Sequence, residues 1–176
     1  MKDVMLDLET FGTRYNAMII SIGACYFDRM TGEVGETFFR NVQPGEHENK
    51  FTTDYSTIRW WLEQSEEARA AICNGAAYIE DALQDLCKFL DTTDRVLVWS
   101  HATFDMPILM NAFETLDILP PIGFRDMRDL RTLMDLANLD KMKRERFGVH
   151  HNALDDAKFQ ASYASDAFVK LNHGTA

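Results

Sequence analysis

One short stretch of this chain, from Val4 to Thr10, constrains the fold more than any other; it reads VMLDLET. Its apolar residues predict a buried β-strand, and side chains alternate across a strand, so Asp7 and Glu9 point to the same side, about 7 Å apart. Two carboxylates that close repel in a protein interior unless a cation lies between them. Mg²⁺ and Mn²⁺ prefer such oxygen ligands. The stretch therefore indicates either a metal site or an edge strand whose polar face is solvated.

The composition fits one globular domain. The chain has 176 residues, 46% of them hydrophobic, which is enough for a full core, so residues 1–176 are predicted to form a single domain. Its 18 Lys and Arg against 28 Asp and Glu give a formal charge of −10. That balance argues against a protein that holds long nucleic acid by bulk electrostatic attraction. It still allows a site where bound metal ions supply positive charge.

The cysteines and the start of the chain predict a protein of a reducing compartment. Cys25, Cys73 and Cys87 are odd in number and far apart, without CxxC spacing, so they indicate neither a disulfide framework nor a zinc site. The first residues lack the layout of a signal peptide, and the longest apolar stretch, 17–27, is too short to span a bilayer. We therefore expect a cytoplasmic protein without membrane contact.

Patterns of apolar residues predict the other elements. Three strands precede any helix, because residues 18–27 form a β-branched and aromatic run and a hairpin turn at 28–32 returns the chain. Helical spacing and short apolar runs then alternate. The expected strands are 4–10, 18–27, 34–42, 95–99 and 122–125, and the expected helices are about 54–62, 66–74, 78–90, 104–116, 128–136 and 153–171. This order predicts an α/β fold with a five-stranded mixed sheet and helices on its faces.

A second chemical stretch follows the expected strand at 95–99. Asp105 lies at the entry of the next helix, and Pro107 takes an early position that tolerates a missing N–H. An acid is therefore expected beside the end of a strand. The alternative is that Asp105 only caps the helix or interacts with its first turn.

The third stretch, residues 150–157, reads HHNALDDA. Asn152 is a good N-cap, and Asp155 three residues later can reach back to the cap's N–H as in a capping box. Asp156 then lies one turn inside the helix. His151 precedes the cap on loop backbone, where an imidazole with a pKa near neutrality can act on a bound water. The alternative for His151 is a hydrogen-bonded surface histidine.

Taken together, these residues resemble the DEDDh branch of the DnaQ-like 3′-5′ exonucleases, which have a ribonuclease H-like fold. The three motifs look like Asp7-Leu8-Glu9-Thr10, then Phe104-Asp105, then residues 151–157, in the expected order and over nearly the whole chain. A closer likeness is to small phage and bacterial members typified by phage exonuclease A and the RNase AS group, because residues 57–65 are similar to a tryptophan-rich helix there. One departure is His101, where proofreading members commonly have Asn.

The resemblance implies a two-metal phosphodiester hydrolysis at the 3′ end of single-stranded DNA or RNA, releasing nucleoside 5′-monophosphates. In this family pattern Asp7 bridges two Mg²⁺ or Mn²⁺ ions, Glu9 and Asp156 complete the site of one, and Asp105 holds the other. His151 is the implied general base for the attacking water. The residues alone leave DNA and RNA both open. Related small members are often dimers, so a homodimer is an expectation.

Substrate contacts are expected to depend on stacking more than on charge. The backbone N–H of Thr10 resembles the family contact to the terminal sugar, and Phe11 and Phe104 are candidates to stack on the terminal bases. Trp61 or Trp60 could also stack, although a Trp pair on a helix is more often part of a core.

Two polar groups near the motifs allow more than one interpretation. The basic cluster contacts either incoming phosphates or only solvent; it comprises Lys141, Lys143, Arg144 and Arg146. Asp126 is predicted to cap the helix that follows the last expected strand.

Two other classes of protein are consistent with parts of the pattern. The doublets His150-His151 and Asp155-Asp156 suggest an HD-type metal phosphohydrolase, which would be all-helical and need further histidine ligands upstream. A non-catalytic ribonuclease H-like module that binds nucleic acid is the second alternative. Such a module would be expected to lack at least one acid or the histidine, and none is missing from this sequence.

Overall fold

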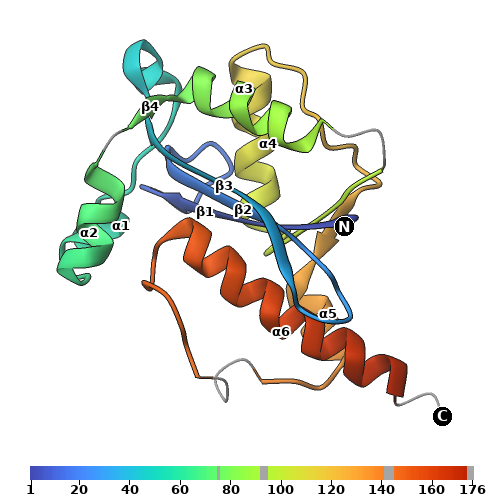
Figure 1. Cartoon of the computed structure of the whole chain (residues 1–176). Coiled ribbons are helices and arrows are strands. Elements are labelled where there is room, and N and C mark those ends of the chain that lie inside the picture. The colour runs from blue at the N-terminus through green and yellow to red at the C-terminus, as the bar shows by residue number, and fades with distance from the viewer. Residues whose placement is uncertain (75, 92–94, 141–144, 174–176) are drawn as a thin grey trace.

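The computed structural model, which describes residues 1–74, 76–91, 95–140 and 145–173, is an α/β fold around a mixed sheet (Figure 1). The strands are β1 (Asp3–Thr10), β2 (Ile19–Phe27), β3 (Val34–Gln43), β4 (Ala77–Tyr78), β5 (Leu97–Ser100) and β6 (Met127–Asp129). Their order is β4-β3-β2-β1-β5-β6. The pairs β1–β2 and β2–β3 are antiparallel, whereas β1–β5, β5–β6 and β3–β4 are parallel. The sheet excludes the all-helical HD-type fold.

The sheet has six strands, so the predicted number of five is wrong. The added strand, β4, has two residues and precedes a helix that was expected to include Tyr78. The strand expected at 122–125 is also wrong, because the chain pairs with β5 only at Met127–Asp129. Phe124 in the expected strand is 81% exposed, so its apolar character does not reflect burial.

The helices lie close to their predicted positions. They are η1 (Gly45–Lys50), α1 (Tyr55–Leu62), α2 (Glu66–Cys73), α3 (Ile79–Leu90), α4 (Asp105–Thr115), α5 (Leu130–Leu136) and α6 (Ala153–His173). Helices α3 and α4 cover one face of the sheet, and α6 crosses the other, with α5 near its C-terminal half (Figure 1). The prediction of helices on both faces is confirmed. Within the described residues, no helix combines the length and apolar character needed to cross a membrane.

Alternation along β1 decides which groups meet each helical layer. Leu6 and Leu8 belong to the core beneath α3 and α4, while Met5 packs in the core beneath α6. Asp7 and Glu9 share the parity of Met5, so both carboxylates face α6, as the strand period predicts.

Gly23 allows α6 to approach that face closely. It lies opposite Asp7 in the β1–β2 register. A Cβ atom built on Gly23 would lie 2.1 Å from the carbonyl carbon of Ala153, the first residue of α6. The start of α6 therefore rests directly on the backbone of β2, which brings the acids of its first turn next to β1.

Strand β1 carries one more buried carboxylate, Asp3, and this one is paired with a cation. Its side chain accepts hydrogen bonds from Arg29 Nε at 2.8 Å and from Trp99 Nε1 at 2.8 Å. The Arg29 guanidinium also lies 4.8 Å from the ring centroid of Phe168. Together these contacts join β1, β5, α6 and the β2–β3 hairpin.

Candidate active site

The structure brings the three predicted motifs together at the end of β1, on the α6 face. Two groups of side chains have ligand atoms within 4.8 Å of one another. We call them the strand group and the loop group. The strand group is Asp7, His101 and Asp105, and the loop group is Glu9, His151 and Asp156. All six residues line one cleft of about 590 Å³.

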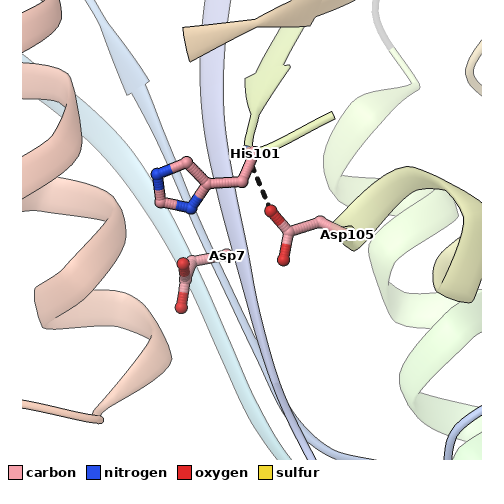
Figure 2. Close-up of side chains that lie close together, drawn as sticks. All are labelled: Asp7, His101 and Asp105. Carbon is pink, nitrogen blue, oxygen red and sulfur yellow. Dashed lines mark hydrogen bonds between the residues drawn. The ribbon is translucent and has the colours of Figure 1, made fainter. Parts of the chain in front are cut away.

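Regular elements position the strand group. His101 directly follows β5, and Asp105 is the first residue of α4. The His101 backbone N–H donates to Asp105 Oδ2 at 2.9 Å, and Figure 2 shows the His101 ring beside Asp7. Asp105 is 1% exposed, and this burial raises its pKa to about 7. Asp105 is therefore a buried acid of the cleft, and the N-cap of α4 is Phe104.

Asp7 lies where the negative charges concentrate. Burial raises its pKa well above the usual range, and the charges of Asp105, Glu9 and Asp156 raise it further. Burial also raises the pKa of Glu9, and the charges of Asp156 and Asp105 raise it further. The side chain of Gln160 donates from Nε2 to Asp7 Oδ1 at 2.6 Å.

Gln160 was not predicted from the sequence. A signal existed, because Gln160 lies four residues after Asp156 and so on the same face of α6. Its neutral amide orients Asp7 without adding charge, and its Oε1 is buried without a hydrogen-bond partner among the described residues.

The loop group depends on an irregular segment before α6. His151 has φ 64°, a left-handed conformation that is uncommon for residues other than glycine. Its backbone N–H donates to Asp156 Oδ2 at 3.0 Å, and Arg146 forms an ion pair with Asp156 Oδ1. The Nδ1 atom of His151 lies 4.0 Å from Glu9 Oε1. The backbone turn thus fixes both the imidazole and the carboxylate.

The start of α6 is capped as predicted, but the capping box is wrong. Asn152 Oδ1 accepts from the N–H groups of Leu154 and Asp155, each at 3.1 Å. The Asp155 carboxylate instead accepts from Val149 N at 2.8 Å, while Asn152 N donates to the Val149 carbonyl. The tight turn before α6 brings the Val149 N–H within reach of Asp155 in place of the cap's own N–H.

Aromatic rings surround the His151 imidazole. It stacks on His150 with centroids 3.8 Å apart, and it meets the rings of Trp60 and Trp61 edge-on at 4.6 and 6.0 Å. Desolvation lowers the pKa of His151, and the neighbouring His150 lowers it further. A neutral imidazole able to accept a proton is therefore favoured near neutral pH.

A second pocket of about 320 Å³ adjoins the cleft along Glu9 and Phe104. Thr10 and Trp61 line it, but Trp61 is only 3% exposed and donates from Nε1 to the Thr10 carbonyl at 3.0 Å. Trp60, 40% exposed, offers more surface. Phe11 packs against the core. Substrate contact by Thr10, Phe11, Phe104 and Trp61 stays a prediction.

Two further predictions can be compared with the structure. Asp126 does not cap a helix; it pairs with Arg95, and Asp129 caps α5 by accepting from Thr132 N at 2.9 Å. The error arose because β6 and α5 begin later than expected. In the basic cluster, residues 141–144 lie outside the described part of the chain, and Arg146 lines the cleft.

The donor set fits a divalent metal ion. Four buried carboxylates converge in the cleft, and burial followed by their mutual repulsion raises the pKa values of Asp7 and Glu9, as expected where a cation is needed. Carboxylate oxygens are ligands that hard divalent cations prefer.

Comparison with known proteins identifies the family of this chain. The sequence model of the 3′-5′ exoribonuclease Rv2179c-like domain family matches residues 2–168. A protein of Enterobacteria phage T4 named exodeoxyribonuclease is 28% identical over 166 residues, covering 77% of this chain and 71% of its own.

Solved structures of nucleases share the fold. The nuclease domain of 3′hExo, a DEDDh family member bound to rAMP, has a TM-score of 0.63 at 15% identity, covering 94% of this chain and 90% of its own. Cell-death related nuclease 4 has a TM-score of 0.69 at 16% identity, covering 98% and 64%. The chain therefore belongs to the 3′-5′ exoribonuclease Rv2179c-like domain family and is a DnaQ-like 3′-5′ exonuclease.

Proposed function

We propose that this cleft hydrolyses the last phosphodiester bond at the 3′ end of single-stranded nucleic acid and releases nucleoside 5′-monophosphates. The observation that carries the proposal is the pairing of two groups, each with two carboxylates and a histidine, inside one cleft. Asp7, Glu9, Asp105 and Asp156 would hold two divalent ions, Mg²⁺ or Mn²⁺. When bound, such ions stabilise negative charge on the attacking and leaving oxygens.

His151 is proposed as the general base. Its imidazole borders the carboxylates, and desolvation keeps its pKa low, so the ring is neutral and can accept a proton from the attacking water. The contacts with Trp60 and His150 restrict how the ring can turn.

The adjoining pocket is proposed to hold the terminal nucleoside. Phe104 and Trp60 supply ring surfaces, and stacking on such rings contributes about 1–3 kcal/mol per base. The Trp61 side chain holds the Thr10 carbonyl in place through a hydrogen bond from Nε1. Because the net charge is −10, affinity for the distant part of a strand should be small.

RNA is the proposed substrate, on the description of the family that matches nearly the whole chain. Single-stranded DNA is the second candidate, favoured by the name of the phage T4 relative. A cytoplasmic location and a homodimer also stay proposals.

The test is digestion of matched RNA and DNA oligomers labelled at either end, with Mg²⁺ or Mn²⁺. We expect a 3′ label to leave at once as a mononucleotide and a 5′ label to give a ladder, with RNA degraded faster. A blocked 3′ hydroxyl should stop the reaction. Cleavage of a circular strand would contradict an exonuclease, and equal or faster loss of DNA would contradict the choice of RNA.

A further inference from the structure

Two cationic side chains among the described residues enter the acidic cleft, Arg131 and Arg146. They are used differently. Arg131 donates from Nη1 to Thr103 Oγ1 at 3.3 Å. Arg146 forms an ion pair with Asp156, one of the four acids proposed to hold metal.

The contacts of Arg146 leave it partly unsatisfied. Besides Asp156, its Nη2 donates to the Val149 carbonyl at 3.3 Å, and the guanidinium lies 4.9 Å from the ring centroid of Phe159. Its Nε is buried and has no hydrogen-bond partner in the described part of the chain. A buried donor without a partner costs free energy. In this position the guanidinium of Arg146 therefore does not make all the hydrogen bonds that it could make.

Arg146 also competes for the atoms that a metal ion would use. Both oxygens of Asp156 are already engaged, Oδ2 by the His151 N–H and Oδ1 by Arg146. A divalent ion held by Glu9 and Asp156 would share Asp156 with a guanidinium. Two cations on one carboxylate repel.

A second partner for Arg146 is provided by the proposed substrate. The guanidinium lines the same cleft as the loop group, and its planar donors suit phosphate oxygens, which accept two parallel hydrogen bonds. A phosphate would also offer acceptors to the donors that are now poorly bonded.

We propose that Arg146 exchanges partners: it neutralises Asp156 when the cleft is free of metal, and it binds a phosphate of the nucleic acid once metal is held by Glu9 and Asp156. This inference rests on the proposed function. Because the nucleic acid removes Arg146 from Asp156, nucleic acid and metal strengthen each other's binding, and the coupling is reciprocal.

The first test measures binding of Mn²⁺ alone to the full-length metal-free chain by electron paramagnetic resonance. Loss of the competing cation in Arg146→Gln should tighten Mn²⁺ binding about 10-fold. Arg131→Gln removes an equal charge from the same cleft without touching Asp156, and should change binding less than about threefold. Unchanged or weaker binding in Arg146→Gln, or equal tightening in both variants, would overturn the exchange.

The second test measures KM for a single-stranded oligomer at saturating Mn²⁺. Arg146→Gln should raise KM about 10-fold, with a smaller effect on kcat, because a phosphate contact is lost. Arg146→Lys retains the charge but not the fork of donors. It should therefore bind Mn²⁺ as the wild type does and still raise KM. An unchanged KM in Arg146→Gln would refute the phosphate contact.

These readouts separate the inference from the proposed function. The Mn²⁺ titration contains no substrate, so it reports on the competition for Asp156 whether or not the protein degrades nucleic acid. A wild type that degrades oligomers from the 3′ end, combined with an Arg146→Gln variant of unchanged Mn²⁺ affinity, would refute the exchange and leave the exonuclease assignment standing.

Discussion

The strand group and the loop group contain the same kinds of residue but are built by different means. Asp7 lies within β1, His101 directly follows the parallel strand β5, and Asp105 begins α4, so regular elements hold the strand group in place. In the loop group, Glu9 shares that strand, but His151 has a left-handed backbone and Asp156 depends on how α6 is seated. One group is fixed by the sheet, and the other is assembled by a loop and a helix.

This difference indicates how the groups respond to change. Asp105 is the most buried of the four acids, at 1% exposed, and burial followed by the charges of the neighbouring acids raises the pKa of Asp7. In the loop group, the positions of the side chains depend on their contacts with Arg146 and His150 and on how α6 packs on the sheet. Substitutions in the strand group should therefore act through charge, and those in the loop group through position.

The largest effect is expected for Asp7→Asn. Loss of this carboxylate should lower the rate of 3′-end degradation by more than about 10⁴-fold, since Asp7 is one of the four acids proposed to hold the metal ions. The same change should raise the melting temperature of the metal-free protein at pH 8, because it relieves repulsion with Asp105, Glu9 and Asp156.

Asp3→Asn is the matched control for Asp7→Asn, on the same strand. Asp3 is buried like Asp7, but it is paired with Arg29, so its loss should lower the melting temperature and leave the chemistry intact. Nuclease assays and thermal unfolding of both variants check the contrast. Retained activity in Asp7→Asn would remove the strand group from the mechanism.

The next largest effect on kcat is expected for substitution of His151, and a smaller one for substitution of His101. His151→Ala should lower kcat about 10²–10⁴-fold, as expected for loss of a general base, while Mn²⁺ still binds. His101→Asn removes the imidazole beside Asp7 and should lower kcat less than about 10-fold. Single-turnover rates at saturating metal test this order, and a larger defect in His101→Asn than in His151→Ala would reverse the proposed roles.

Local sequence patterns predicted the acids of both groups. The contacts that these acids make with other side chains depend on tertiary packing and were not predicted. The period of two in β1 placed Asp7 and Glu9 on one face, and the motif around Asn152 gave the start of α6. Gln160 and the Arg146–Asp156 pair were missed as contacts because they arise only when α6 lies on the sheet.

The strand at β6 shows the same limit for the fold. The segment Met127–Asp129 is polar and lacks the apolar run that predicts a strand, yet its backbone pairs with β5. The more apolar residues just before it attracted the prediction, although Phe124 is exposed. Edge strands of a few residues are determined by their neighbour's backbone, and the sequence carries little trace of that pairing.

Gly23→Ala tests the seating of α6. The new methyl group would collide with the Ala153 backbone, so α6 must move away from β2 and carry Asp156 with it. We expect a loss of about 1–3 kcal/mol in the free energy of unfolding. Misplacement of the loop group should also lower kcat about 10–100-fold.

The control for this variant is Gly35→Ala on β3, where the nearest atom is the flexible end of the Met1 side chain. It should fold and degrade oligomers like the wild type. Denaturant unfolding and kcat measured on both variants check the prediction, and normal activity in Gly23→Ala would show that the loop group tolerates movement of α6.

The smallest effect concerns the stability of the metal-free protein as pH changes. Burial raises the pKa of Asp105 to about 7, and that of Asp7 rises for the same reason, whereas an unfolded Asp titrates near about 4. Between those values the folded protein keeps protons that the unfolded chain releases, so the free energy of unfolding should fall as pH rises. The lowered pKa of His151 acts in the opposite direction, in a window just below 6.5.

Mg²⁺ should reverse this loss, because it binds the carboxylates in their charged form and competes with protons. Thermal unfolding in EDTA should therefore give a higher melting temperature at pH 5 than at pH 8, and added Mg²⁺ should raise it by several degrees at pH 8 but little at pH 5. Asp7→Asn should weaken both trends, since it removes the acid at the centre of the repulsion. If Mg²⁺ stabilised the wild type equally at both pH values, the raised pKa values of the strand group would not be linked to metal binding.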